Sequence, residues 1–265
     1  MKSGEILGYL VISSLILGLI SPVMYYYLSP SFNIDEMKFE VNKGNHSWSE
    51  RIHISWENWN GLKVTRTYRS SEDCLEIEDI SEKSINIELN VGEVKLLGES
   101  RSTRVCGEIT VERDEKQIKF TGNSGSIEVY PSNEISIKIG VGKVSFSEAK
   151  AESVEIELGM GEIDGNAEIK DLRLEIGSGS LTTSFKVKDD GKLFISGVGN
   201  FSVELLLENE VPLSFSSNSI GSCSLFIKNE EYDCKGNFKY SESDKGVEVR
   251  LNTVGNAEIR VKREE

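Results

Sequence analysis

The chain has 265 residues, of which 38% are hydrophobic and 8% aromatic, and its formal net charge is −14. This length fits one or two domains, and the hydrophobic content is sufficient for a packed core, which argues against a wholly disordered chain. The excess of acidic residues, without a basic stripe, argues against a protein that binds the phosphates of nucleic acid.

Residues 1–34 are predicted to form a membrane anchor and its juxtamembrane segment. No charged residue lies between Ile6 and Ile34. About 20 residues of helix cross the hydrocarbon core of a bilayer, and Ile6 to Leu28 supplies this length, with Tyr25 to Tyr27 placed like an interfacial aromatic belt. A cleaved signal peptide is the alternative, but the sequence has no A-x-A cleavage site. We therefore expect one uncleaved transmembrane helix in a single-pass cell-membrane protein.

Residues 35–80 are predicted to form a β cap. Runs at 37–41, 51–56 and 62–68 alternate between apolar and polar residues, and Asn60-Gly61 between the last two is a strong hairpin signal. All three tryptophans of the chain, Trp48, Trp56 and Trp59, lie in this region. Their bulky rings are expected to seal one end of a stacked repeat, which would otherwise expose strand edges. An aromatic platform for carbohydrate is the alternative.

Residues 81–265 repeat one phrase, an alternating apolar strand followed by a glycine, a polar residue and another apolar residue. Before Gly161, for example, Val154, Ile156 and Leu158 stand at positions −7, −5 and −3, and Ile163 follows at +2. The glycines that anchor the phrase recur every 15 to 22 residues: Gly92, Gly107, Gly125, Gly142, Gly161, Gly179, Gly199, Gly221, Gly236 and Gly255. This period predicts an all-β repeat fold, a β-solenoid or β-roll of about ten rungs, in which each glycine serves a turn or a close backbone approach.

The register of the repeat is predicted to shift in its later part. Before Gly199 the apolar residues are Leu193 and Ile195, at −6 and −4. One inserted residue reverses which side chains point inward, so a bulge is expected there.

The four cysteines favour an oxidising compartment. Cys74, Cys106, Cys223 and Cys234 show no C-x-x-C spacing, which argues against a zinc ribbon. They form either disulfides, with Cys74–Cys106 and Cys223–Cys234 as fitting local pairs, or small buried apolar residues. The sequons at 45–47 and 200–202 also favour an extracellular location for the large C-terminal part.

Two motifs that resemble catalytic or cofactor sites are better explained by structure. Gly159 to Gly165 is glycine-rich like a dinucleotide loop, but the helix that this motif needs does not follow it. His46 and His53 are the only histidines, and no G-x-S-x-G elbow accompanies them. We expect no cofactor.

Paired carboxylates are the remaining candidates for catalysis, because β-helix enzymes place such groups on one face. Glu155 with Glu157 and Glu162 with Asp164 are such pairs. The equivalent positions of other repeats mix acidic, basic and neutral residues, which predicts ion pairs across strands on a solvated face. The calcium-binding repeat G-G-x-G-x-D is not matched. We therefore expect neither a metal site nor an enzyme.

The G-x-G-[EKS]-[IVL] phrases at 140–144, 159–163 and 177–181 resemble the putative-adhesin, toast-rack-like domains of bacterial and archaeal envelope proteins. The resemblance covers roughly residues 81–265. It implies a β-solenoid in the cell envelope and brings no active-site residues with it.

The expected function is structural, adhesive or protein-interacting, in a protein held to the membrane by its N-terminal helix and facing a protein or surface-glycan partner. An envelope-stress sensor acting through a membrane partner is one alternative, although only Met1 to Glu5 precede the apolar run. A β-helix enzyme acting on polysaccharide is the other.

Overall fold

The computed structural model describes residues 36–41, 48–57, 61–70, 74–78, 84–98, 102–113, 116–130, 132–228, 230–243 and 245–264. Between residues 36 and 70 it describes the backbone alone. The predicted anchor, the sequon at 45–47, His46 and Trp59 lie outside the described residues. No helix among the described residues has the length and apolar character needed to cross a membrane.

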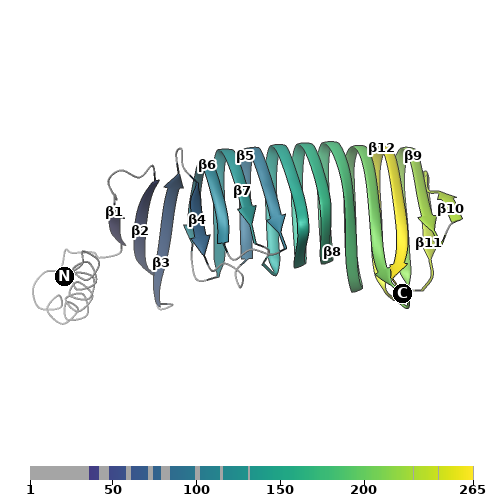
Figure 1. Ribbon diagram of the computed structural model, residues 1–265, viewed down its shortest axis with the longest axis horizontal. Coiled ribbons are helices and arrows are strands. Elements are labelled where there is room, and N and C mark those ends of the chain that lie inside the picture. Colours follow the sequence, from purple (N-terminus) through teal and green to yellow (C-terminus); the bar gives the residue numbers. More distant parts are fainter. Residues whose placement is uncertain are drawn as a thin grey trace, which may run out of the picture.

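The described part of the chain is all-β, as the alternating pattern predicts, and its strands form one mixed sheet of 12 strands. The strands are β1 (Glu36–Val41), β2 (Trp48–Glu57), β3 (Gly61–Ser70), β4 (Leu75–Glu78), β5 (Ser84–Leu97), β6 (Ser102–Arg113), β7 (Gln117–Val129), β8 (Glu134–Glu208), β9 (Leu213–Ile227), β10 (Glu230–Asp233), β11 (Gly236–Ser241) and β12 (Val247–Glu264). Figure 1 shows them side by side in one long row, with β1 at one end and β10 and β11 at the other.

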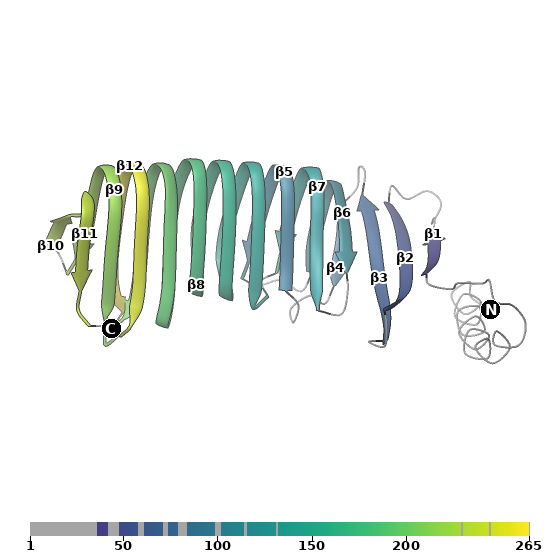
Figure 2. The ribbon, with the colours of Figure 1, turned by 180° about the vertical axis from the view of Figure 1, so that it is seen from behind.

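At the N-terminal end of the row, β1, β2 and β3 form an antiparallel meander. β2 pairs with β3 through Glu57 and Gly61, which gives the hairpin predicted from Asn60-Gly61. β3 then pairs with β6, and the short strand β4 pairs with another part of β6. Trp48, Trp56 and His53 lie on β2. The meander therefore continues the sheet beyond β6, and Figure 2 shows it from behind.

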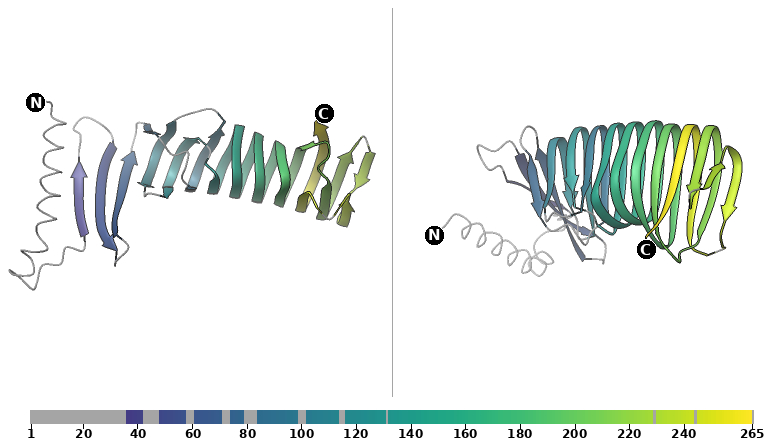
Figure 3. Two further views of the ribbon diagram at one scale, coloured as in Figure 1. Left: turned by 90° about the horizontal axis from the view of Figure 1, so that it is seen from below. Right: turned by 45° about the vertical axis from the view of Figure 1, so that its right-hand side comes forward.

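The middle of the row is the long element β8, which winds through successive coils around a common interior (Figure 3, right). Inward side chains stack from coil to coil. For example, Ile85 and Ile87 of β5 lie opposite Ile135 and Ile137 of β8, and all four are buried. Burial of apolar side chains that match across strands is the main stabilising contact between coils, because a single coil has no core of its own.

Nine of the ten anchor glycines stack into one column, here called the glycine ladder. In spatial order it runs Gly107, Gly125, Gly92, Gly142, Gly161, Gly179, Gly199, Gly255 and Gly221. Gly236 lies outside the glycine ladder. It begins β11, lies opposite Ser219 in the antiparallel pairing with β9, and has no atom within 4 Å of an added Cβ. Its φ of 71° makes it a turn residue, so the sequence pattern placed one rung too many in the stack.

The spatial order of the ladder differs from the chain order at both ends. β5 lies between β7 and β8 and pairs parallel with each, while β6 pairs antiparallel with β7. β12 lies between the last coil of β8 and β9, and pairs parallel with both. The C-terminal strand is therefore inserted into the stack rather than added to its end. The coils at each end of the stack share one apolar pattern with their immediate neighbours, so the pattern does not specify which of them lies beside which.

The predicted shift in register occurs between the coils of Gly179 and Gly199. Gly197 lies against Ile176, while two residues later Gly199 lies against Gly179. The segment from Ile176 to Gly179 therefore advances three residues while the segment from Gly197 to Gly199 advances two. The coil of Gly179 accommodates one extra residue, at Gly177 and Ser178. β12 follows the shifted register, with Leu251 opposite Ile195.

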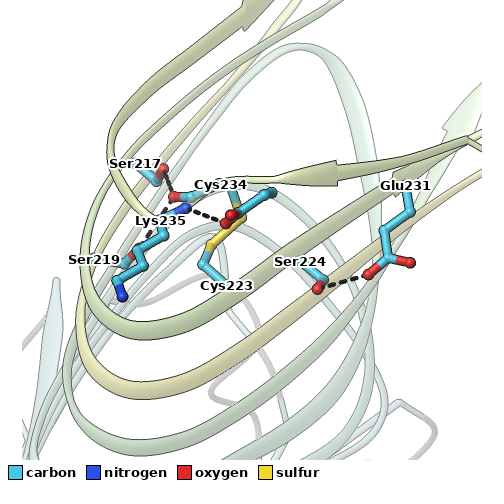
Figure 4. Close-up of a disulfide and its surroundings, with 8 residues drawn as sticks. Ser217, Ser219, Cys223, Ser224, Glu231, Cys234 and Lys235 are labelled. Atoms are coloured by element: carbon cyan, nitrogen blue, oxygen red, sulfur yellow. Dashed lines mark hydrogen bonds between the residues drawn. A yellow bond between two sulfur atoms is a disulfide. The ribbon is translucent and has the colours of Figure 1, made fainter.

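The C-terminal end of the row is covered by β10 and β11, which pair antiparallel with the outer edge of β9. Cys223 and Cys234 form a disulfide there, and both residues are buried. The hydroxyls of Ser217 and Ser219 donate hydrogen bonds to the carbonyl oxygen of Cys234, at 2.6 and 3.1 Å (Figure 4). These bonds satisfy polar groups that would otherwise be buried without partners.

Half-buried rings on β10 and β11 pack against the core at the same end. Phe238 lies 6.3 Å from Phe215 and 6.5 Å from Tyr232, measured between ring centroids, and Tyr232 lies 5.4 Å from Tyr240. The Tyr232 hydroxyl donates a hydrogen bond to the Glu230 carboxylate, and this bond raises the pKa of Tyr232 to about 12. The rings cover the apolar interior where the stack ends.

Arg263, near the end of β12, ties three separate backbone segments together. Its Nη1 donates to the carbonyl oxygens of Asn209 and Val211, at 3.2 and 2.5 Å, and its Nη2 donates to the carboxylate of Glu242. The backbone N–H of Leu213 donates to the same carboxylate at 3.0 Å. Burial alone would raise the pKa of Glu242, but the Leu213 hydrogen bond and the Arg263 charge outweigh it and hold this pKa below its usual value.

We expect Glu242→Gln to lower the free energy of unfolding at pH 7 by about 2 kcal/mol, the usual range for hydrogen bonds to a charged group. Because the pKa of Glu242 is lowered by folding, its contribution is present above the carboxyl's ordinary pKa and is lost as the pH falls through the folded value. Urea unfolding at pH 7 and at pH 3 measures this: the variant and the parent chain should differ at pH 7 and converge at pH 3. An equal difference at both pH values would contradict the assignment.

Candidate interaction surface

One corner of the stack is built from the G-x-G phrases. An ideal Cβ placed on Gly142, Gly161, Gly179 or Gly199 would lie 1.7 to 1.9 Å from the carbonyl oxygen of the ladder glycine in the preceding coil. Only glycine permits this approach of backbone to backbone. A second column lies two residues before the ladder glycines and contains Gly140, Gly159 and Gly177. An ideal Cβ placed on these glycines would lie 2.4 to 2.6 Å from a carbonyl oxygen of the preceding coil. The residue between the two columns is thereby pushed outward.

These outward residues form a row of apolar side chains, which we call the apolar ridge. The row crosses seven neighbouring coils, and the coil of Gly179 has a serine, Ser178, at this position. The six apolar members are 45 to 68% exposed: Val91, Val141, Met160, Val198, Val254 and Ile220. Val91 is opposite Val141, and Val254 is opposite both Val198 and Ile220. Strand spacing of ~4.8 Å gives the ridge a length of about 30 Å. Among the described residues, the ridge contains every large hydrophobic side chain that is exposed.

Beside the C-terminal half of the ridge lies a shallow hollow of about 230 Å³ on the outer face, here called the polar hollow. It spans four coils and is lined mainly by hydroxyl and amide side chains: Ser180, Thr182, Asn200, Ser202, Ser222, Ser224 and Asn256. Among the lining residues only Glu258 is charged, and Arg260 donates a hydrogen bond of 2.5 Å to it.

A directed chain of hydrogen bonds crosses the polar hollow. The Ser222 hydroxyl donates to Oδ1 of Asn256 at 2.7 Å, and Nδ2 of Asn256 donates to Oδ1 of Asn200 at 3.0 Å. Asn256 lies between Asn200 and Ser222 because β12 is inserted between β8 and β9. The chain fixes the orientation of both amides, and Asn200, which ends it, is exposed.

Beside the N-terminal half of the ridge, the equivalent outer positions are ionic. Lys143 lies 2.6 Å from Asp164 and 3.8 Å from Glu162, and Lys138 lies 2.7 Å from Glu157. The hydrogen bond that Lys143 donates to Asp164 is the largest effect that raises the pKa of Lys143, and the bond that Lys138 donates to Glu157 acts in the same way on the pKa of Lys138.

The paired carboxylates that the sequence suggested for catalysis therefore serve ion pairs. Glu155 is bound by Arg173 at 3.3 Å, and Arg173 also pairs with Glu175. Such bridges between coils agree with the predicted pairing across strands, and their exposure limits each to about 0–1 kcal/mol.

The other predicted site residues lie apart from this surface. Cys74 pairs with Cys106 at the N-terminal end, and no cysteine in the described part of the chain is free. Gly159 and Gly165 lie within β8, without a helix to follow them. Across the described ranges, no three His, Cys, Asp or Glu side chains are grouped so that they could hold a metal ion.

Sequence reasoning did not single out the apolar ridge. The signal was present, since an apolar residue recurs between two glycines in Gly140-Val141-Gly142, Gly159-Met160-Gly161 and Gly197-Val198-Gly199. The polar hollow carries no such signal, because its central residue, Asn256, lies 56 residues from one partner and 34 from the other.

No protein-family model matches the sequence, and no curated protein matches it. Among solved structures, the chain is similar to one described as a putative cell adhesion protein from Clostridium sporogenes, with 15% identity and a TM-score of 0.43 over 72% of this chain and 99% of that one. It is also similar to a putative adhesin from Parabacteroides merdae, with 14% identity and a TM-score of 0.40 over 71% of this chain and 81% of that one. Both descriptions agree with the family that the glycine phrases resemble.

Proposed function

We propose that this chain is a membrane-anchored β-solenoid displayed outside the cell, with an adhesive or structural role and no catalytic activity. In the described residues the stack consists of nine coils that carry the glycine ladder, and the β1–β3 meander lies at its N-terminal end. The apolar ridge is the observation that carries this function.

Exposed apolar surface is unfavourable in water, and single exposed hydrophobic residues scattered over a protein need no special explanation. Here every large exposed hydrophobic side chain in the described ranges lies in one line, at one position of the repeat, beside positions that hold polar and charged groups. A line of exposed apolar side chains with a polar rim, interrupted here only at Ser178, is typical of a surface that binds a partner. Rigid stacking of the coils keeps the strip straight, so contact along it requires little ordering of the protein.

The extracellular location is supported by the two disulfides, Cys74–Cys106 and Cys223–Cys234. Disulfides persist in oxidising compartments and are rare in the cytosol. Ion pairs occupy the carboxylates that could otherwise serve as general acids or bases, which supports a role without catalysis.

Display and adherence can be tested together on cells that produce the full chain. Protease added to intact cells should remove the C-terminal part, and thiol reagents should label the chain only after reduction. Cells producing Val141→Glu/Met160→Glu should adhere to one another at least tenfold less than cells producing the parent chain. Contact at the ridge would bury the two added carboxylates without partners, which is unfavourable.

Ser147→Glu/Ser153→Glu is the matched control, since it adds the same charge at exposed positions of nearby coils outside the ridge. This control should adhere like the parent chain. Full protection from protease with free thiols would refute extracellular display. Undiminished adherence of the ridge variant would refute the assigned surface.

A further inference from the structure

The two halves of the apolar ridge face different chemical surroundings. Next to Val141 and Met160 the outer positions hold Lys143 and Glu162, which are charged. Next to Val198 and Val254 they hold Asn200 and Asn256, which are neutral. A protein with a net charge of −14 thus has one hollow in which the lining side chains, apart from Leu181, Phe201, Ala257 and Glu258, all carry a hydroxyl or an amide.

We propose that the polar hollow, together with Val198, Val254 and Ile220, binds a neutral polyhydroxylated ligand, an uncharged glycan. This inference rests on the proposed function and names the ligand class of the displayed surface. Hydroxyl and amide side chains both donate and accept hydrogen bonds, which matches sugar hydroxyls, and the apolar side chains offer contact to the C–H faces of the sugar rings.

The geometry also favours a neutral ligand over a charged one. The single carboxylate in the lining, on Glu258, already accepts a hydrogen bond from Arg260, so it offers no unpaired charge for a cation. No lysine or arginine lines the hollow to pair with an anion. Specificity would then come from the placement of hydrogen-bonding groups, since charge complementarity has nothing to act on.

An extended peptide is disfavoured by the same pairings that build the hollow. Peptides that bind to sheets add a strand to an open edge and use main-chain hydrogen bonds. β12 has no open edge here, because β8 occupies one side and β9 the other. Recognition must therefore use side chains alone.

The hydrogen-bond chain from Ser222 through Asn256 to Asn200 prepares the site for its ligand. Each amide is already oriented by its neighbour, so binding need not order it. In the unglycosylated chain the Asn200 amide nitrogen ends this chain of hydrogen bonds, and we assign it the role of donor to a sugar hydroxyl; a glycan attached at the sequon of residues 200–202 would occupy this nitrogen instead. Coils repeat along the hollow at ~4.8 Å, so equivalent groups are presented at regular intervals to a linear polymer.

The test uses the full chain in detergent micelles, applied to surfaces coated with dextran, mannan or galactomannan, and to alginate as an acidic polymer. We expect saturable binding to at least one neutral polymer and none to alginate. Asn256→Asp should weaken that binding at least tenfold, because it replaces the donor to Asn200 by a second oxygen and adds a charge. Val254→Ser should weaken it several-fold.

Two variants control for unspecific effects. Asn90→Asp removes the same kind of donor, since the Asn90 amide nitrogen donates to Oδ1 of Asn123 at 3.0 Å on a neighbouring coil outside the hollow. Val91→Ser changes a ridge residue beside the charged half. Both should bind like the parent chain, and thermal unfolding should show that all four variants are folded.

Binding to none of the three neutral polymers, binding to alginate alone, or equal losses in Asn256→Asp and Asn90→Asp would overturn the inference. If a library of extended peptides bound in a manner sensitive to Asn256→Asp while the glycans did not, the hollow would be a peptide site. Should the chain be displayed and adherent but bind no neutral glycan, this inference fails and the proposed function stands. Should it not be displayed, the proposed function fails whatever the glycans show.

Discussion

Gly161→Ala is expected to lower the free energy of unfolding by at least about 4 kcal/mol, a loss that few single substitutions cause. The added methyl group would lie 1.7 Å from the carbonyl oxygen of Gly142, well inside van der Waals contact. The φ of 147° at this position also disfavours a side chain. Because Gly142 is itself held against Gly92, the coils can separate only by breaking their parallel hydrogen bonds.

Urea unfolding of the full chain, followed by the circular dichroism of its strands, measures this loss. Gly142→Ala separates the two causes: its φ is outside the left-handed region, yet its Cβ would lie 1.8 Å from the Gly92 oxygen, so it should be nearly as harmful. Gly236→Asn is the control, because this glycine has open space and a φ of 71° that asparagine tolerates, and it should cost no more than about 1 kcal/mol. A Gly161→Ala protein as stable as the control would show that the coils do not stack as described.

Removal of the Cys223–Cys234 disulfide by Cys223→Ala/Cys234→Ala is expected to cost about 3 kcal/mol, from the loop entropy of a sequence separation of 11. Loss of this disulfide should change the structure more than the cost in free energy suggests. The disulfide holds β10 and β11 against β9, whose other edge is already paired with β12. Once the cover frays, the outer edge of β9 presents unpaired N–H and C=O groups and becomes a site for self-association.

Chromatography with light scattering should therefore detect concentration-dependent oligomers of this variant, and urea unfolding should give the loss in stability. Cys74→Ala/Cys106→Ala is the matched comparison. Its longer loop, with a separation of 32, predicts a loss of about 4 kcal/mol, but β3 still pairs with β6 at that end, so the chain should stay monomeric. Monomeric behaviour of both variants would show that β10 and β11 hold to β9 without the disulfide.

Local features of the fold were open to prediction because they depend on residues close together in sequence. The alternation before Gly161 specifies a strand with one buried face, and its recurrence before Gly142 and Gly179 specifies matching coils. The one-residue shift at Leu193 and Ile195 also predicted the change of register that the structure places between the coils of Gly179 and Gly199. Mixed charges at the outward positions predicted ion pairs such as Lys138–Glu157.

The candidate surface was less predictable, for two separate reasons. The apolar ridge depends on a corner geometry, in which close contacts at Gly140 and Gly142 turn Val141 outward although it is as apolar as its buried neighbours. The polar hollow depends on which coil lies beside which. Asn256 meets Asn200 and Ser222 only because β12 enters the stack between β8 and β9.

By itself, the sequence determined that this chain forms an all-β repeat, where each coil turns, and which side chains face the interior. Periodicity carries that information, since inward and outward positions follow from spacing along one strand. Only the tertiary structure decided the order of the coils and the exclusion of Gly236 from the ladder. The physical reason is that coils with the same apolar pattern pack equally well against one another, so their neighbours are selected by the covering of strand edges at the two ends: β6 with β3 and β4, and β9 with β10 and β11.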